Sequence, residues 1–137
     1  MSGLGQECAK KATQTLLEYF SIKEQEQIIN VGICGASKEY AVGELIEINS
    51  LMYSENFYTL NQREGKTLTC IDNPATDNKY DIVDMESFGF YQAVKGMNNA
   101  YIFKIVSDHF EPQTVTKERT KNLLFKQIDE IMKRVNQ

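Results

Sequence analysis

The sequence predicts one α/β domain built on a mixed or mostly parallel sheet. Short apolar runs alternate with amphipathic stretches along the 137 residues, which is typical of this class. The run 100–106 is apolar on both faces apart from Lys104, as in a central strand that is covered on both sides. The length fits a single domain over 1–137, and the sequence shows no repeat, low-complexity segment or interdomain linker.

The first half of the chain predicts one helix followed by several strands. Ala9, Ala12, Leu16 and Phe20 recur at helical spacing. They predict a helix over 6–20. Apolar and alternating runs predict strands over 27–31, 43–49, 56–60 and 67–71, with a turn over 61–66 and a loop over 72–78. The first of these strands is expected to end at Gly32.

The second half predicts two strand–helix pairs. A short strand over 81–83 precedes a helix over 86–97, which carries an apolar stripe of Gly89, Ala93 and Met97. The strand 100–106 precedes a last helix over 114–135. The stripe of this helix comprises Leu124, Ile128, Ile131 and Val135.

Composition excludes several classes of function. The net charge of −4 and pI of about 5.1 argue against nucleic acid or an anionic membrane as partner. No apolar run approaches the ~20 residues of a membrane helix, and no signal peptide is visible, so a soluble cytoplasmic protein is expected. Three cysteines without CxxC spacing and one histidine predict buried thiols in a reducing compartment rather than a metal site.

Two acids follow predicted strands and form the main functional lead. Glu86 stands where a strand passes into a helix in "IVDMESFGFYQAV", and Asp108 ends "IFKIVSD". Ligands of α/β sheets bind outside the carboxyl ends of strands. One carboxylate can hold vicinal hydroxyls through charge-assisted hydrogen bonds, and a second can act as a general acid.

Simpler interpretations of these residues stay open. Glu86 also suits the positive end of the following helix. Asp108 also suits a turn before Pro112, and His109 is expected to be an incidental neighbour because the chain offers no triad.

Two glycine pairs are weaker signals. In "VGICGAS", Gly32 and Gly35 predict either a close approach of the backbone to a flat ligand or a tight turn after the strand. In "SGLGQE", Gly3 and Gly5 resemble the start of a phosphate-binding helix but lack the third glycine of a dinucleotide fingerprint.

These segments, in their order, resemble the nucleoside phosphorylase/nucleosidase superfamily, which includes purine nucleoside phosphorylase and methylthioadenosine/adenosylhomocysteine nucleosidase. The resemblance spans nearly the whole chain. Its segments are "SGLGQECAKKATQTLLEYF", "IINVGICGASKEYAVGELIEI", "VDMESFGFYQAV" and "IFKIVSD". It implies a three-layer α/β/α fold with a mixed central sheet that lacks the family's opening strands.

The resemblance also implies roles for individual residues. Glu86 would bind the ribose 2′- and 3′-hydroxyls, and Met85 would pack against the sugar. Asp108 would protonate or hydrogen-bond the purine, and Ser107 would orient Asp108. Cys34 and Gly35 would line the base pocket.

Departures from the family pattern bear on the reaction. Asn30 stands where hexameric phosphorylases carry a phosphate-binding arginine, and Ile33 replaces a small residue. The acid that activates water in the nucleosidases lies in the opening strands. Phosphate is therefore only a candidate co-substrate, with Gly5 as its candidate binding residue, and hydrolysis is favoured over phosphorolysis.

The resemblance thus predicts cleavage of the N-glycosidic bond of purine nucleosides, by a nucleosidase or phosphorylase reaction. The alternative is a degenerate homologue that binds nucleosides or purines without catalysis. Neither needs a metal or an organic cofactor. The expected partners are a small nucleoside and further copies of the chain, as a homodimer or a higher oligomer.

Overall fold

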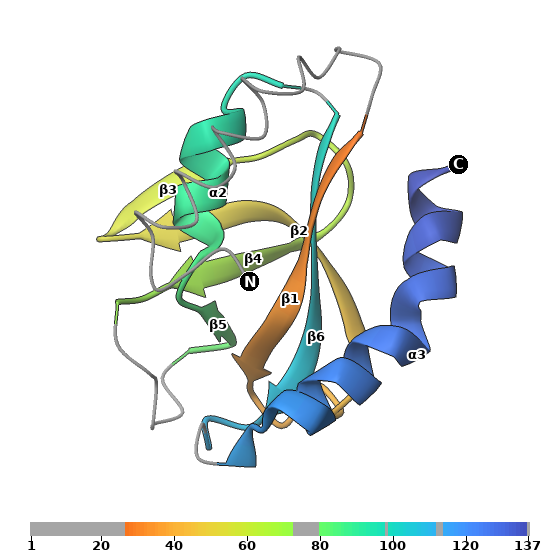
Figure 1. Ribbon diagram of the computed structural model, residues 1–137. Coiled ribbons are helices and arrows are strands. Elements are labelled where there is room, and N and C mark those ends of the chain that lie inside the picture. Colours follow the sequence, from red (N-terminus) through yellow and green to blue (C-terminus); the bar gives the residue numbers. More distant parts are fainter. Residues whose placement is uncertain (1–26, 73–79, 98, 112–113, 137) are drawn as a thin grey trace.

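The computed structural model describes residues 27–72, 80–97, 99–111 and 114–136. The predicted helix over 6–20, together with Gly3, Gly5 and Cys8, lies outside the described residues. The described elements are β1 (Ile28–Ala36), β2 (Leu45–Tyr53), β3 (Asn56–Thr59), β4 (Lys66–Cys70), β5 (Ile82–Asp84), α2 (Ser87–Val94), β6 (Ala100–Asp108) and α3 (Lys117–Val135) (Figure 1).

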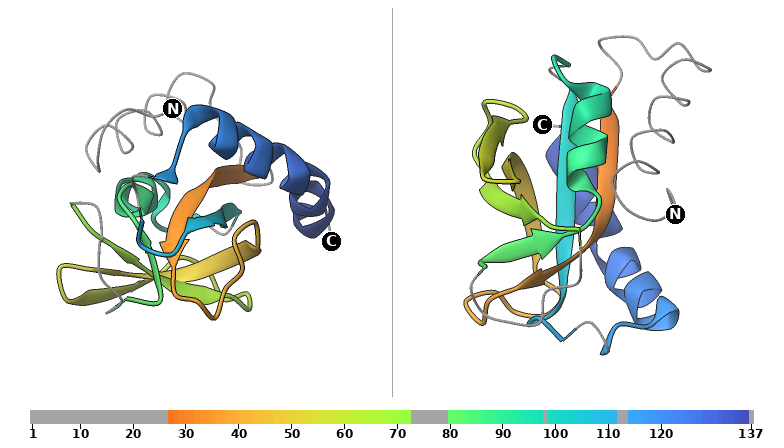
Figure 2. Two further views of the ribbon diagram at one scale, coloured as in Figure 1. Left: turned by 90° about the horizontal axis from the view of Figure 1, so that it is seen from below. Right: turned by 90° about the vertical axis from the view of Figure 1, so that its left-hand side faces the viewer.

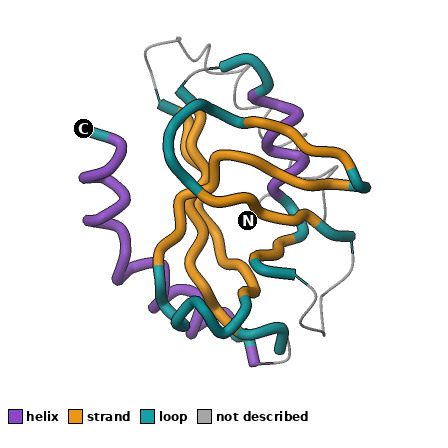
Figure 3. The backbone as a smooth tube through the Cα atoms, turned by 180° about the vertical axis from the view of Figure 1, so that it is seen from behind, coloured by secondary structure: helices purple, strands orange, loops and turns teal. Residues whose placement is uncertain are grey.

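The strands form one mixed sheet, as predicted. Their order is β3-β2-β4-β5-β1-β6, and a further pairing of β2 with β6 makes the sheet curl back on itself. The pairs β1–β6, β2–β4 and β4–β5 are parallel, whereas β1–β5, β2–β3 and β2–β6 are antiparallel. Seen from behind, the strands converge near the centre and fan out to two sides (Figure 3).

The parallel pair β1–β6 is the longest strand pairing of the described sheet. The two strands run parallel from Ile28↔Ala100 to Gly35↔Asp108. Every residue of β6 from Ile102 to Asp108 is buried, because strands and helices cover both of its faces. The predicted central strand is therefore confirmed, and it continues two residues beyond its predicted end at 106.

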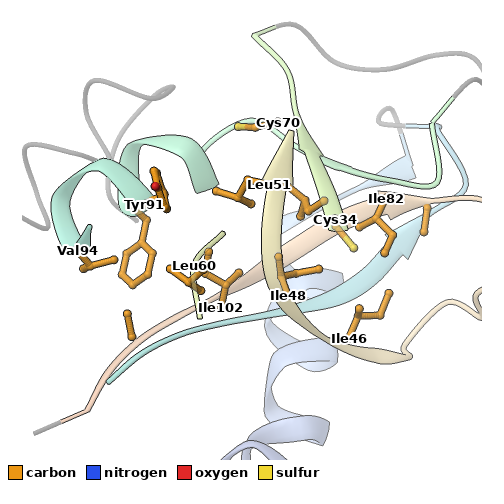
Figure 4. Packing of buried hydrophobic residues seen from close by; sticks show 14 of the residues in the cluster. Cys34, Ile46, Ile48, Leu51, Leu60, Cys70, Ile82, Tyr91, Val94 and Ile102 are labelled. Carbon is orange, nitrogen blue, oxygen red and sulfur yellow. The ribbon is translucent and has the colours of Figure 1, made fainter. Parts of the chain in front are cut away.

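Two apolar clusters lie on different sides of this strand pair. The larger one joins α2 to the curled sheet and includes Cys34, Ile48, Leu51, Tyr91 and Ile102 (Figure 4). The smaller one joins Ile131 and Val135 of α3 to Phe103 of β6. Burying each large side chain contributes about 1.5–3 kcal/mol. The two helices accordingly lie on different sides of β1 and β6 (Figures 1 and 2). The mixed α/β class is confirmed, and the three-layer arrangement stays a prediction.

The prediction of a turn at Gly32–Gly35 was wrong. Strand β1 continues through both glycines to Ala36, because β6 offers it backbone partners along this whole length. The register shifts only once, by a bulge between Cys34 and Gly35. An apolar run that stops at a glycine therefore predicts too short a strand when the neighbouring strand continues to offer backbone partners.

The helices are shorter than predicted. Helix α2 spans Ser87–Val94, and the chain leaves it through Gly96 at φ 88, a left-handed conformation that favours glycine. Helix α3 begins after Thr116, whose side chain accepts a hydrogen bond from the Arg119 backbone N–H. Of the predicted α3 stripe, Ile131 and Val135 are buried, whereas Ile128 is 44% exposed. Neither described helix is long and apolar enough to cross a membrane.

Candidate active site

A cavity of about 1330 Å³ lies between β1, the β5–α2 turn, the end of β6 and α3. All six predicted site residues that the structure describes line it: Cys34, Gly35, Met85, Glu86, Ser107 and Asp108. Gly5 lies outside the described residues. The sheet thus brings the two predicted acids, which lie 22 positions apart in the sequence, to one hollow.

Asp108 is the last residue of β6 and is 8% exposed. Its Oδ1 lies 2.5 Å from the Ser107 hydroxyl, and its Oδ2 accepts the Glu111 backbone N–H at 2.8 Å. Ser107 Oγ also lies 3.2 Å from the Cys34 carbonyl oxygen. These contacts fix the plane of the Asp108 carboxyl group.

The alternative interpretation of Asp108 is also partly realised. Its bond to the Glu111 N–H caps the turn that follows β6. Within this turn Phe110 has φ 65, a strained conformation for a bulky residue. Burial of Phe110 to 5% exposure holds it there. His109 does not line the cavity, and its Nδ1 lies 3.0 Å from the Ala36 carbonyl oxygen, which is an incidental structural role as expected.

Gly35 allows β1 to approach Asp108 closely. A Cβ at this position would lie 3.3 Å from Val83 Cγ2 and 3.6 Å from Asp108 Oδ2. The space at Gly35 is thus taken by neighbouring protein atoms, and a close approach of the backbone to a flat ligand stays a prediction.

Glu86 is the N-cap residue of α2 and lines the cavity. Within the described chain its side chain makes no capping hydrogen bond to this helix. Asp84 has that task, because its Oδ1 accepts the Ser87 backbone N–H at 3.3 Å and its Oδ2 accepts the Ser87 hydroxyl proton. Helix capping is thus assigned to Asp84, and Glu86 contributes to the lining of the cavity.

Lys104 is a cavity residue that the sequence did not identify as functional. Its Nζ lies 3.0 Å from Asp84 Oδ2 and 2.9 Å from Asn30 Oδ1. The Lys104 and Asp84 side chains are only 4% and 6% exposed. The one available signal was a single charged residue inside an otherwise apolar strand.

Burial raises the pKa of the Cys34 thiol to about 12, with the nearby carboxylates of Asp84 and Asp108 adding to the effect against the opposing Lys104 ammonium. A neutral, buried thiol is not a nucleophile. The thiols of Cys34 and Cys70 are both buried, as predicted. No group of three or more His, Cys, Asp or Glu that could hold a metal ion occurs among the described residues.

All three arginines lie in the described chain, and none of them lines the cavity. Arg63 pairs with Glu47 and lies over the Tyr101 ring at 3.8 Å. Arg134 pairs with Glu130. The described cations around the cavity are Lys104, Lys117 and Lys121.

No protein-family model matches the chain, and no curated protein matches it by sequence. Solved structures do match. A methylthioadenosine/S-adenosylhomocysteine nucleosidase from Colwellia psychrerythraea, in complex with adenine, superposes with a TM-score of 0.68 over 90% of this chain and 74% of its own, at 15% identity. The Helicobacter pylori nucleosidase, with butyl-thio-DADMe-Immucillin-A, gives 0.70 over 94% and 78%, at 12% identity. The Chlamydia trachomatis nucleosidase gives 0.65 over 90% and 72%, at 18% identity.

The chain has the fold of these nucleosidases. The likeness that the sequence motifs predicted is therefore confirmed at the level of the fold.

Proposed function

We propose that this chain cleaves the N-glycosidic bond of purine nucleosides. The observation that carries the proposal is the convergence of Glu86 and Asp108, from separate elements, on one cavity that also contains Met85, Ser107, Cys34 and Gly35. Support comes from the nucleosidase fold and from the adenine bound in the Colwellia structure.

The proposed chemistry uses the two carboxyl groups differently. Glu86 accepts two hydrogen bonds from the ribose 2′- and 3′-hydroxyls, as a carboxylate can. Asp108, oriented by Ser107, donates a proton or a hydrogen bond to the purine ring as the bond to C1′ breaks and its electron pair moves to the base. Glu86 also stabilises the positive charge that develops on the sugar ring. Water then adds to C1′ and releases a proton to the solvent, from which Asp108 is reprotonated, and this completes hydrolysis.

Hydrolysis is the favoured form of the reaction. A tight phosphate site uses bidentate arginine contacts, and no arginine of the described chain lines the cavity. The Asn30 side-chain oxygen accepts a bond from Lys104, so it is engaged within the wall of the cavity. Phosphate remains a candidate co-substrate that the product assay addresses.

Substitution of the two acids tests these roles. Glu86→Ala removes the ribose contacts, so we expect nucleoside affinity to fall at least about tenfold while affinity for free adenine is kept. Asp108→Asn keeps the shape of the side chain but removes the acid, so turnover should fall about 10²–10⁴-fold with nucleoside binding retained.

Matched controls lie on the exposed surface away from the cavity. Glu64→Ala and Asp129→Asn change the same residue types at exposed positions and should leave binding and turnover at wild-type values. Calorimetric titration and base release measure the two quantities. Wild-type values for Glu86→Ala and Asp108→Asn would refute the assignment.

A second candidate function is nucleoside or purine binding without catalysis. It is favoured because each described carboxylate of the cavity already has a partner or a proposed role. Within the described chain these are Asp84, Glu86 and Asp108. Asp84 is held by Lys104 and Ser87, and the proposal gives Glu86 and Asp108 other roles, so no described acid is left to activate water. Binding of adenine, adenosine or inosine with no base release at high enzyme concentration would establish this alternative.

We also propose that the chain assembles as a homodimer or a higher oligomer. Large apolar side chains are exposed on several described elements, among them Phe57 on β3 and Met132 on α3, neither of which lines the cavity. Such groups mark association surfaces when they are contiguous. Light scattering after size-exclusion chromatography measures the mass in solution, and a fully active monomer would contradict this proposal.

A further inference from the structure

The ion pair between Lys104 and Asp84 links the elements that carry the two proposed active-site acids. Lys104 lies on β6, four residues before Asp108. Asp84 ends β5, two residues before Glu86. Strands β5 and β6 are not neighbours, because β1 lies between them in the sheet. The 3.0 Å contact from Lys104 Nζ to Asp84 Oδ2 therefore crosses β1. It links β6, which carries Asp108, directly to the end of β5, which leads to Glu86.

The other contacts of this pair fix its geometry. Lys104 Nζ is held on its far side by Asn30 Oδ1 at 2.9 Å. Gly32 leaves the space for the ammonium group, since a Cβ there would lie 3.0 Å from Nζ. The Asp84 carboxylate in turn binds both the backbone N–H and the hydroxyl of Ser87. Asp84 precedes Met85 and Ser87 follows Glu86, so the Asp84 carboxylate holds both ends of the turn that carries these two residues.

Backbone pairing gives this turn little other support. Strand β5 has three residues. Its register partners are two residues of β1 (Gly35↔Val83 and Ala36↔Ile82) and two of β4 (Thr69↔Val83 and Cys70↔Asp84). A turn that leaves so short a strand depends on its side-chain contacts for its position.

Stability alone does not account for the pair. Both side chains are almost fully buried, and the desolvation of two charges offsets most of their attraction. An apolar pair of the same volume is often as stable. The neighbouring residues of β6 are apolar, so Lys104 interrupts a strand that would pack well without it.

We propose that Lys104 is a positioning residue that sets the place of Glu86 relative to Asp108 through Asp84. Its effect is selective for the sugar half of the ligand, because Glu86 is the ribose-binding group. Affinity for the free base depends on β1 and the end of β6, which are held together by their own pairing from Ile28↔Ala100 to Gly35↔Asp108. This inference rests on the function proposed above.

The test is the double variant Lys104→Met/Asp84→Asn. Methionine keeps the length of the lysine stem, and asparagine keeps an oxygen that can accept the Ser87 N–H. The titrations are made in the Asp108→Asn background, in which the nucleoside is expected to bind without turnover. Titration with methylthioadenosine and with free adenine then gives two dissociation constants, and thermal unfolding gives Tm. We expect Tm to stay within about 5 °C of wild type, nucleoside affinity to fall about tenfold, and adenine affinity to change less than about twofold.

Controls separate this inference from the proposed function. Lys95→Met removes an exposed lysine next to α2 and should leave both affinities unchanged. Lys104→Gln/Asp84→Asn, which also removes both charges, is used if the first double variant does not fold, and it should show the same selective loss. Equal loss of both ligands, or no loss of either, overturns the positioning role. If Glu86→Ala also leaves nucleoside affinity unchanged, the proposed function itself fails. If Glu86→Ala loses nucleoside selectively and the double variant does not, only this inference fails.

Discussion

Asp108 illustrates how two requirements meet at a single residue. Its side chain closes a turn by accepting the Glu111 N–H, and its other oxygen receives the Ser107 hydroxyl while the group still lines the cavity. The sequence motif identified both residues of this pair. It could not identify Lys104, because a lone lysine in an apolar strand has no motif and its partners Asn30 and Asp84 are 74 and 20 positions away.

The raised pKa of the buried Cys34 thiol can be tested by its reactivity. Since burial raises its pKa from 9.0 to about 12, its thiolate population near pH 8 is about a thousand times smaller than that of an ordinary cysteine. A Cys8→Ser/Cys70→Ser variant should therefore react with a thiol reagent at least about a thousand times more slowly when folded than when unfolded in urea. Equal rates in the two states would contradict the buried, neutral thiol.

The same pKa has a consequence for stability. Below about pH 9 the thiol is neutral in both the folded and the unfolded states, so Cys34 contributes no pH dependence. Between pH 9 and about 12 the unfolded state loses this proton first, so stability falls as the pH rises. Urea unfolding of the single-cysteine variant at pH 8 and pH 10, compared with a cysteine-free Cys34→Ala version, isolates this contribution.

At the scale of elements, alternation and amphipathic spacing predicted nearly every described strand and helix. What the sequence misplaced were the ends. Strand β1 runs four residues past Gly32, since pairing with β6 outweighs the weak strand preference of glycine. Helix α3 begins after Thr116, not at 114, because its capping hydrogen bond to Arg119 N–H fixes the first turn.

Helix α3 offers a direct test of that capping bond. Thr116→Ala removes the acceptor of the Arg119 N–H, so we expect a loss of about 1 kcal/mol in the free energy of unfolding. Thr116→Ser keeps a hydroxyl that can accept the same N–H, so it should lose much less. Urea denaturation of both variants measures the difference, and an equal loss in the two would argue against the cap.

At the scale of the whole molecule, the α/β fold class could be predicted from the sequence. The closure of the sheet by the β2–β6 pairing could not. Burial on both faces of β6 follows from its apolar run. The second pairing of β2, with β6 as well as β4, depends on curvature that accumulates over several strands, and no local pattern encodes it. Ile48 marks the point of closure, since it pairs with Lys66 of β4 and with Ile102 of β6.

Ile48 is fully buried, so its truncation tests the closed arrangement. Ile48→Ala should lower the free energy of unfolding by about 2–5 kcal/mol through lost burial and a residual cavity. Met52→Ala, on the same strand but half-buried and paired only to β3 and β4, should cost less. Chemical denaturation measures both values. A smaller loss for Ile48→Ala than for Met52→Ala would contradict the closed core.

Release of free base from a nucleoside tests the central claim most directly. Wild-type protein and the Asp108→Asn variant are incubated with methylthioadenosine, adenosine and inosine, with and without phosphate, and the base is separated by chromatography. The account predicts base from the wild-type protein without phosphate and a large loss in the variant. No base from the wild-type protein under any condition, at high enzyme concentration and long times, would contradict the enzymatic assignment, and equal release by both proteins would contradict the role of Asp108.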